Sequence, residues 1–124
     1  MKLNHIAITI TDVSEIEGFY KNLLGMKDVR RFEISKDKVI EIFGIEKEIV
    51  AYQLQKDDLV FEVFVLLQTF EKGFNHICIS VPDREELVRK AIKNSYNVTR
   101  IKREHFDLIF VKDRSGNIFE IKQD

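Results

Sequence analysis

The chain has 124 residues, of which 44% are hydrophobic, and its 20 Lys and Arg nearly balance 21 Asp and Glu. This length fits one domain, and a formal net charge of −1 gives no electrostatic signature for nucleic acid or an anionic membrane. No apolar run approaches the ~20 residues that cross a bilayer. With one cysteine and no secretory signal pattern, we expect a cytoplasmic protein, for which small molecules or protein partners remain as ligands.

The first half begins with a strand and a helix. Residues 3–10 alternate large and small side chains, which predicts a strand. Apolar residues at helical spacing over 16–24 predict a helix that Asp12 or Ser14 caps and that ends at Gly25. The sequence then predicts a strand, a short amphipathic helix and two further strands, at residues 27–34, 36–43, 48–54 and 59–67.

The second half repeats this order. We expect a strand over 74–81, a helix over 84–94 capped by Asp83, and three strands at residues 98–103, 107–112 and 118–122. His5 and His76 begin two similar segments 71 residues apart (76 − 5), whereas Glu62 and Glu120 are 58 residues apart (120 − 62). The short helix over 36–43 accounts for most of the 13-residue difference (71 − 58).

Strand alternation predicts which side chains share a face. If Ile6, Ile8 and Ile10 pack under the first helix, then His5 points to the other face together with small neighbours, and the same holds for His76. Glu62 and Glu120 each stand between large apolar residues in the last strand of a repeat, so they should face the same side as the histidines. We expect two histidines and two carboxylates to converge.

Such a set is costly to bury unless a cation compensates it. A divalent ion bound by neutral imidazoles and carboxylates would satisfy all four groups, and mixed nitrogen and oxygen ligands suit Zn, Ni, Co, Fe or Mn. One or two open positions would remain for water or substrate. Taken singly, each residue has a plainer interpretation: a hydrogen-bonded strand histidine, a solvated Glu62 paired with a lysine, or Glu120 on an exposed terminal strand.

The chain resembles the vicinal oxygen chelate superfamily, which includes glyoxalase I, methylmalonyl-CoA epimerase, extradiol dioxygenases, and fosfomycin and bleomycin resistance proteins. The matching segments are His5–Ile8 with Asp12, Phe19–Tyr20, Leu24–Gly25, Phe61–Phe64, Asn75–Ile77 and Phe110–Glu120. The family's usual Asp-Pro-Asp-Gly turn is replaced by Asp113–Gly116.

The resemblance implies an α+β fold in which two βαβββ modules pair into a cupped, eight-stranded mixed sheet with helices on the convex side. One domain would span 1–124, with modules at about 1–70 and 71–124. It also implies His5, Glu62, His76 and Glu120 as metal ligands, Glu120 as the leading catalytic base and Glu62 as a ligand or second base. A homodimer is expected.

The function implied first is that of a metal-dependent isomerase or lyase, similar to lactoylglutathione lyase or an epimerase. It would move a proton on the carbon next to a carbonyl or enediolate oxygen held by the ion. The alternatives are a non-catalytic binding or antibiotic-resistance protein of the same fold, and a ring-cleaving dioxygenase. The second glutamate argues against the dioxygenase, which generally uses two histidines and one glutamate.

Four other residues could contribute chemistry. Cys78 shares the predicted face of His76, but we expect it to be a small buried hydrophobe. Arg31, Arg103 and His105 lie near predicted strand ends, where a cation could hold an anionic substrate group, although surface exposure is the expected role of each.

Overall fold

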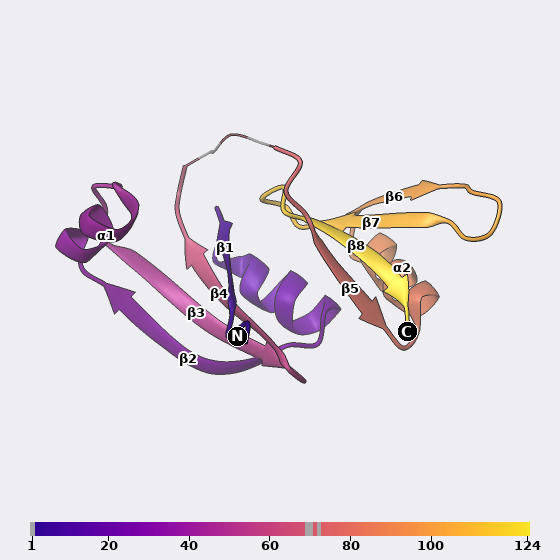
Figure 1. The fold of residues 1–124 in the computed structure, drawn as a ribbon, viewed down its shortest axis with the longest axis horizontal. Coiled ribbons are helices and arrows are strands. Elements are labelled where there is room, and N and C mark those ends of the chain that lie inside the picture. Colours follow the sequence, from indigo (N-terminus) through magenta and orange to yellow (C-terminus); the bar gives the residue numbers. More distant parts are fainter. Residues whose placement is uncertain (1, 69–70, 72) are drawn as a thin grey trace. The chain divides into compact units, whose positions relative to one another are not determined.

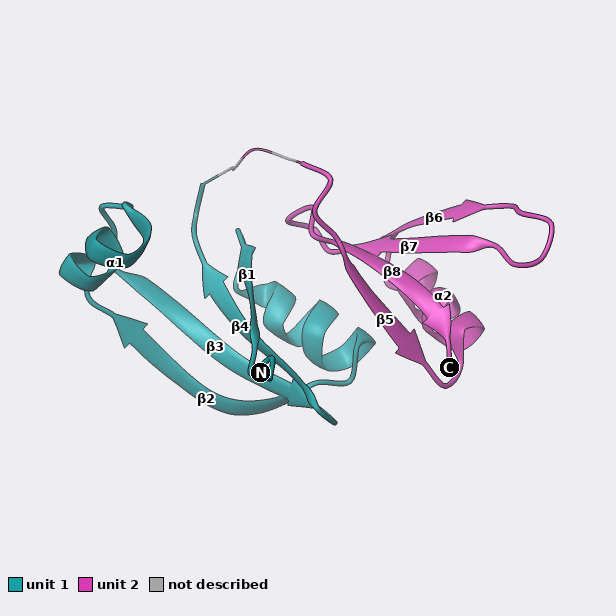
Figure 2. Cartoon of the chain, in the orientation of Figure 1, with its two compact units in different colours: residues 1–69 teal, residues 70–124 magenta. Residues whose placement is uncertain are grey.

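A computed structural model describes residues 2–68, 71 and 73–124 of the chain. The chain divides into two compact units, Met1–Thr69 and Phe70–Asp124 (Figure 2). The module boundary predicted near residue 70 lies outside the described residues, and the single domain stays a prediction. Among the described residues, no helix has the length and apolar character needed to cross a membrane.

The described part of unit 1 contains the predicted strands and helices in the predicted order, including the short helix over residues 36–43 (Figure 1). Its elements are β1 (Ile6–Ile10), η1 (Ile16–Leu23), β2 (Lys27–Ile34), α1 (Lys36–Phe43), β3 (Ile49–Lys56) and β4 (Leu59–Val65). The strands form a sheet in the order β1-β4-β3-β2, in which β1 pairs parallel to β4 and the other pairs are antiparallel.

Unit 2 repeats this topology, but its described residues contain no helix equivalent to α1. Its elements are β5 (Ile77–Val81), α2 (Arg84–Lys93), β6 (Asn97–Ile101), β7 (Leu108–Lys112) and β8 (Ile118–Gln123). The sheet order is β5-β8-β7-β6, again with one parallel pair. Among the described residues, eight strands in two mixed sheets, together with three helices, confirm the predicted α+β fold.

Local sequence accounts for most helix ends. Gly44 has φ +69° just after α1, a conformation that favours glycine, and the Asp83 carboxylate accepts a hydrogen bond from the Glu86 N–H (2.8 Å) at the start of α2. Ser14 and Glu15 are α-helical and directly precede η1, and the Asp12 carboxylate accepts a hydrogen bond from the Ser14 N–H (2.8 Å), as predicted for a cap at Asp12.

The two faces of the first sheet carry different helices. The rings of Tyr20 in η1 and Phe61 in β4 meet edge to face with centroids 6.2 Å apart, which places η1 on the face of Phe61. Phe43 of α1 contacts Phe64 at 5.8 Å, and Phe64 points the opposite way from Phe61 because three residues separate them along a strand. The helices η1 and α1 therefore cover opposite faces.

The core beneath η1 yields a stability prediction. Phe61 is fully buried, so Phe61→Ala should lower the free energy of unfolding by about 3–5 kcal/mol through lost burial and a residual cavity. The matched control is Phe74→Ala, because Phe74 is fully exposed and its loss should change stability by less than about 0.5 kcal/mol. Urea unfolding followed by circular dichroism measures both, and equal effects would contradict the packing described.

Candidate metal centre

In unit 1, a histidine and a glutamate lie side by side on the face opposite η1. His5 directly precedes β1, and Glu62 lies in β4 with Ala7 as its register partner. The His5 Nε2 and Glu62 Oε2 atoms are 3.4 Å apart, with side-chain exposures of 44% and 14%. The imidazole is thus accessible while the carboxylate is largely enclosed.

Unit 2 forms the same pair from equivalent elements. His76 directly precedes β5, and Glu120 lies in β8 with Cys78 as its register partner. The His76 Nε2 and Glu120 Oε2 atoms are 3.7 Å apart, with exposures of 45% and 16%. Both histidines were predicted inside strands, whereas each stands one residue before its strand begins.

The ring of His76 is held in a defined orientation. Its Nδ1 lies 3.1 Å from the carbonyl oxygen of Phe74, which can only accept a hydrogen bond. A neutral His76 therefore carries its proton on Nδ1 and leaves a lone pair on Nε2, the nitrogen that faces Glu120. The ring also meets Phe110 edge to face at 6.2 Å. A backbone carbonyl on the remote nitrogen is the usual support for a metal-binding histidine.

The spacing within each pair fits two ligands of one ion. Two atoms that each lie about 2.1 Å from a cation at the tetrahedral angle are about 3.4 Å apart. The separation is 3.4 Å in the first pair and slightly wider, 3.7 Å, in the second. Imidazole nitrogen and carboxylate oxygen are also donors that Zn and neighbouring divalent metals accept. The residues present therefore fit the implied metal.

The structure brings the four predicted ligands together as two pairs. Within the described residues of either unit, no group of three or more His, Cys, Asp or Glu side chains surrounds one point. A single centre formed by His5, Glu62, His76 and Glu120 therefore stays a prediction.

Glu62 and Glu120 have different neighbours, and the sequence patterns did not predict this difference. Lys122 Nζ lies 3.8 Å from Glu120 Oε1, whereas the register partner of Glu62 in β3 is Gln53. The position of Lys122 beside Glu120 is predictable from the sequence, because side chains two residues apart along a strand point to the same face. Gln53 depends on the register between two strands, which no local pattern specifies.

Cys78 is exposed, so its prediction as a small buried hydrophobe is wrong. Partial desolvation raises the pKa of its thiol, and the negative charge of Glu120 raises that pKa further. A raised pKa leaves less thiolate at neutral pH and opposes nucleophilic reactivity.

The remaining predicted cations are surface residues, as expected. Arg31 lies 3.6 Å from Glu33 and over the ring of Tyr52, Arg103 lies over the ring of Phe106, and His105 is exposed.

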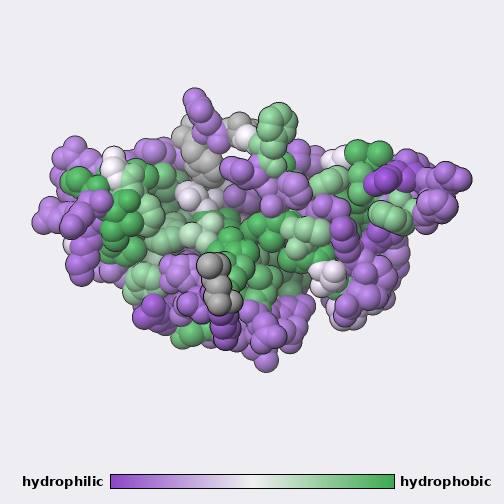
Figure 3. All heavy atoms as spheres, in the orientation of Figure 1, coloured by the Kyte–Doolittle hydropathy of each residue, from purple (hydrophilic) through white to green (hydrophobic). Residues whose placement is uncertain are grey.

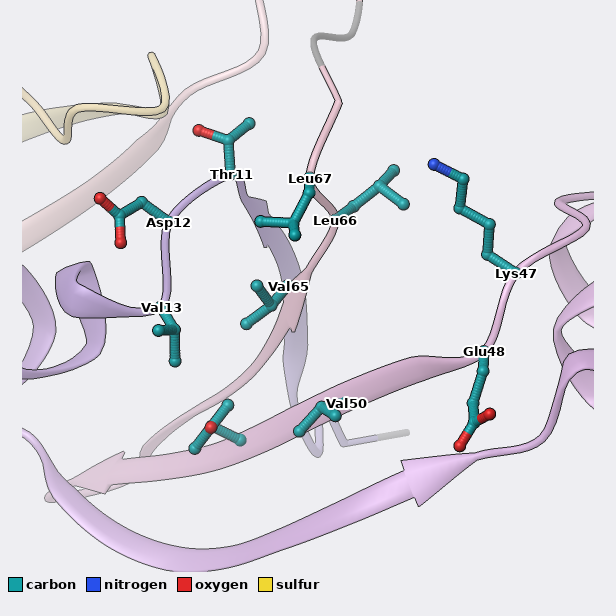
Figure 4. A pocket seen from close by; sticks show the side chains of 10 residues that line it. Thr11, Asp12, Val13, Lys47, Glu48, Val50, Val65, Leu66 and Leu67 are labelled. Carbon is teal, nitrogen blue, oxygen red and sulfur yellow. The ribbon is translucent and has the colours of Figure 1, made fainter.

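A cavity of about 600 Å³ lies on the other face of the first sheet (Figure 4). Val50 and Val65 line it, and both alternate with residues of the Glu62 face. Asp12, Lys47 and Glu48 supply the charged part of its lining. The cavity is therefore separated from His5 and Glu62 by the sheet itself.

Comparison with known proteins assigns the chain to a family. The model of the Glyoxalase/Bleomycin resistance protein/Dioxygenase superfamily matches residues 2–121. The chain belongs to this superfamily. The duplicated topology is therefore that of a superfamily member.

Curated relatives within the superfamily are similar over almost the whole chain. A lactoylglutathione lyase of Arabidopsis thaliana is 29% identical over 96% of the chain, which spans only 43% of that protein. The mitochondrial methylmalonyl-CoA epimerase of Homo sapiens is 28% identical over 98% of the chain and 73% of its own length. The lactoylglutathione lyase of Salmonella typhimurium is 28% identical, with 98% and 91% covered.

Solved structures agree on the fold. Glyoxalase I of Leishmania major has a TM-score of 0.76 at 23% identity, covering 99% of this chain and 86% of that one. A mutant of the fosfomycin resistance protein FosX from Listeria monocytogenes, complexed with Mn(II), has a TM-score of 0.75 at 15% identity, covering 98% and 90%.

The environment of Cys78 predicts a measurable titration. In metal-free protein, its alkylation by iodoacetamide should reach half-maximal rate above pH ~8.5, the ordinary thiol value. Glu120→Gln removes one negative charge beside the thiol, so the midpoint should move to lower pH. Glu62→Gln, the matched change in the other unit, should leave the midpoint unchanged. Mass spectrometry follows the single cysteine, and an unchanged midpoint in Glu120→Gln would contradict the contact.

Proposed function

We propose that this protein is a metal-dependent lyase or isomerase that moves a proton on a carbon next to a carbonyl group. The observation that carries the proposal is the duplicated pair: an accessible imidazole beside a largely enclosed carboxylate, at equivalent positions of both units. Similarity to lactoylglutathione lyases and to methylmalonyl-CoA epimerase over nearly the whole chain supports this class of reaction.

In this proposal, His5, Glu62, His76 and Glu120 hold one divalent ion, of Zn, Ni, Co, Fe or Mn. The donor set and the spacing within each pair support the assignment. A bound ion would supply Lewis acidity, which lowers the pKa of a C–H group next to a coordinated carbonyl. The relevant substrates are glutathione thiohemiacetals or acyl-CoA esters, both of which present such a carbon.

The proton transfer is assigned to the carboxylates. Glu120 is the proposed base: its Oε2 lies 3.7 Å from His76 Nε2, and its Oε1 lies 3.8 Å from Lys122 Nζ. Glu62 Oε2 lies 3.4 Å from His5 Nε2, and we assign Glu62 as the second base of an epimerisation, which needs proton removal and return on opposite sides of one carbon.

We also propose that the chain forms a homodimer. Leu3 and Leu67 are 73% and 80% exposed, and large apolar side chains at a surface commonly mark a contact between protein chains. Size-exclusion chromatography with light scattering should give about twice the monomer mass of 14.7 kDa. A protein that stays monomeric at concentrations up to about 100 μM would contradict this assembly, since a stable dimer dissociates only at much lower concentrations.

Metal content and one substitution test the proposed chemistry. After loading with Zn, Ni or Co and dialysis, the protein should retain one ion per chain. Glu120→Gln should lower kcat/KM by at least about 100-fold, because a positioned base contributes roughly that factor. Glu104→Gln, an exposed glutamate of the same unit, is the matched control and should keep full activity.

The assays follow two reactions. One measures conversion of the methylglyoxal–glutathione thiohemiacetal to the thioester, and the other measures deuterium uptake at the α-carbon of methylmalonyl-CoA in D₂O. Protein that retains no stoichiometric ion, or Glu120→Gln with undiminished turnover, would contradict the proposal.

A further inference from the structure

The helix α1 is the main structural difference between the two units. It fills the connection between β2 and β3 in unit 1, whereas residues 102–107, which connect β6 and β7 in unit 2, form no helix. The His and Glu pair is therefore duplicated, but the structure beside it is not. A helix present in unit 1 alone is suited to recognise a part of the substrate that the duplicated His and Glu pairs do not contact.

The helix packs on the same sheet face as the His5 and Glu62 pair. Val39 of α1 is completely buried against Ala51 and Phe64, and Ile45, which follows the helix, packs against this cluster. Phe64 lies two residues beyond Glu62 in β4, so both side chains point to the same face. Figure 1 shows α1 at one end of β3, and Figure 3 shows hydrophobic surface around it.

A small apolar cavity lies between α1 and the sheet. Its volume is about 120 Å³, and its lining includes Ala7 and Thr9 of β1, Phe64 of β4, and Phe43 and Ile45 at the end of α1. Except for Thr9, these side chains are apolar. An apolar cavity of about 150 Å³ can hold a benzene molecule, so this one has room for an alkyl group of about four or five carbons.

The cavity begins one step along the strands from the proposed ligands. Ala7 pairs with Glu62, and the next same-face pair, Thr9 with Phe64, already lines the cavity. Two residues along a strand span about 7 Å, so a substrate held by an oxygen near Glu62 would reach the cavity with a group a few bonds away.

We propose that this cavity binds a short apolar substituent of the substrate and makes the enzyme selective for carbonyl compounds with a small alkyl group. The inference rests on the proposed function. It assigns Phe43 and Ile45 as specificity-determining residues. At the position equivalent to Phe64, two residues after the glutamate, unit 2 carries Lys122, so the apolar preference belongs to unit 1 alone.

Two matched variants and a control isolate the cavity. Ile45→Ala enlarges it and Ile45→Phe fills it. Ile42→Ala removes the same atoms as Ile45→Ala from an exposed position of α1 that does not line the cavity. Circular dichroism spectra of all three should match the parent protein, which separates ligand effects from loss of fold.

The first measurement needs neither metal nor turnover. Normal alcohols from ethanol to hexanol are titrated into metal-free protein while isoleucine methyl resonances are followed by NMR. We expect saturable shifts at Ile45 and Ile49, with affinity rising about fourfold per added methylene up to four or five carbons. Ile42 methyl resonances should not move, Ile45→Phe should lose binding at least tenfold, and Ile45→Ala should prefer longer alcohols.

The second measurement connects the cavity to the proposed metal centre. Alkyl hydroxamates of increasing chain length, which chelate a metal through two oxygens, are titrated into metal-loaded protein by calorimetry. Their affinity should show the same optimum length and the same shift in Ile45→Ala, but not in Ile42→Ala.

The outcomes separate this inference from the proposed function. Alcohol binding without saturation or length dependence, or a flat hydroxamate series on protein that does bind metal, would overturn the substrate cavity. Failure to bind metal, with alcohol binding intact, would overturn the proposed function and sustain an apolar ligand site beside Glu62.

Discussion

The structure depends on the register of two parallel strand pairs, β1 with β4 and β5 with β8. Phe61 and Val63 are fully buried, and Glu62 between them must therefore face the other side of the sheet. Phe119 and Ile121 constrain Glu120 in the same way. A slip of one residue would drive each carboxylate into an apolar core, at a cost of several kcal/mol. Burial of the neighbours thus positions the glutamates.

Duplication of this constraint yields two similar pairs in different surroundings. Glu62 has Ala7 and Gln53 as register partners and Phe64 two residues further along, whereas Glu120 has Cys78 and a lysine, Lys122. The proposed ligands are thus duplicated, whereas the side chains beside them are not.

Sequence patterns predicted the strands and α1 well, because alternation, helical spacing and the glycine at position 44 are local signals. They did not predict which sheet face α1 covers, since an amphipathic helix fits either face and the contact between Phe43 and Phe64 is not local. The repeat predicted that each histidine lies near the glutamate of its own unit, but it did not predict the other neighbours of these side chains.

The most direct test of the account is X-ray absorption spectroscopy of the zinc-loaded protein. If His5, Glu62, His76 and Glu120 hold one ion, the spectrum should show only nitrogen and oxygen donors at about 2.0–2.2 Å, with the outer-shell scattering of two imidazole rings. A sulfur donor at about 2.3 Å, or the scattering of a single imidazole, would contradict a shared centre built from both repeats.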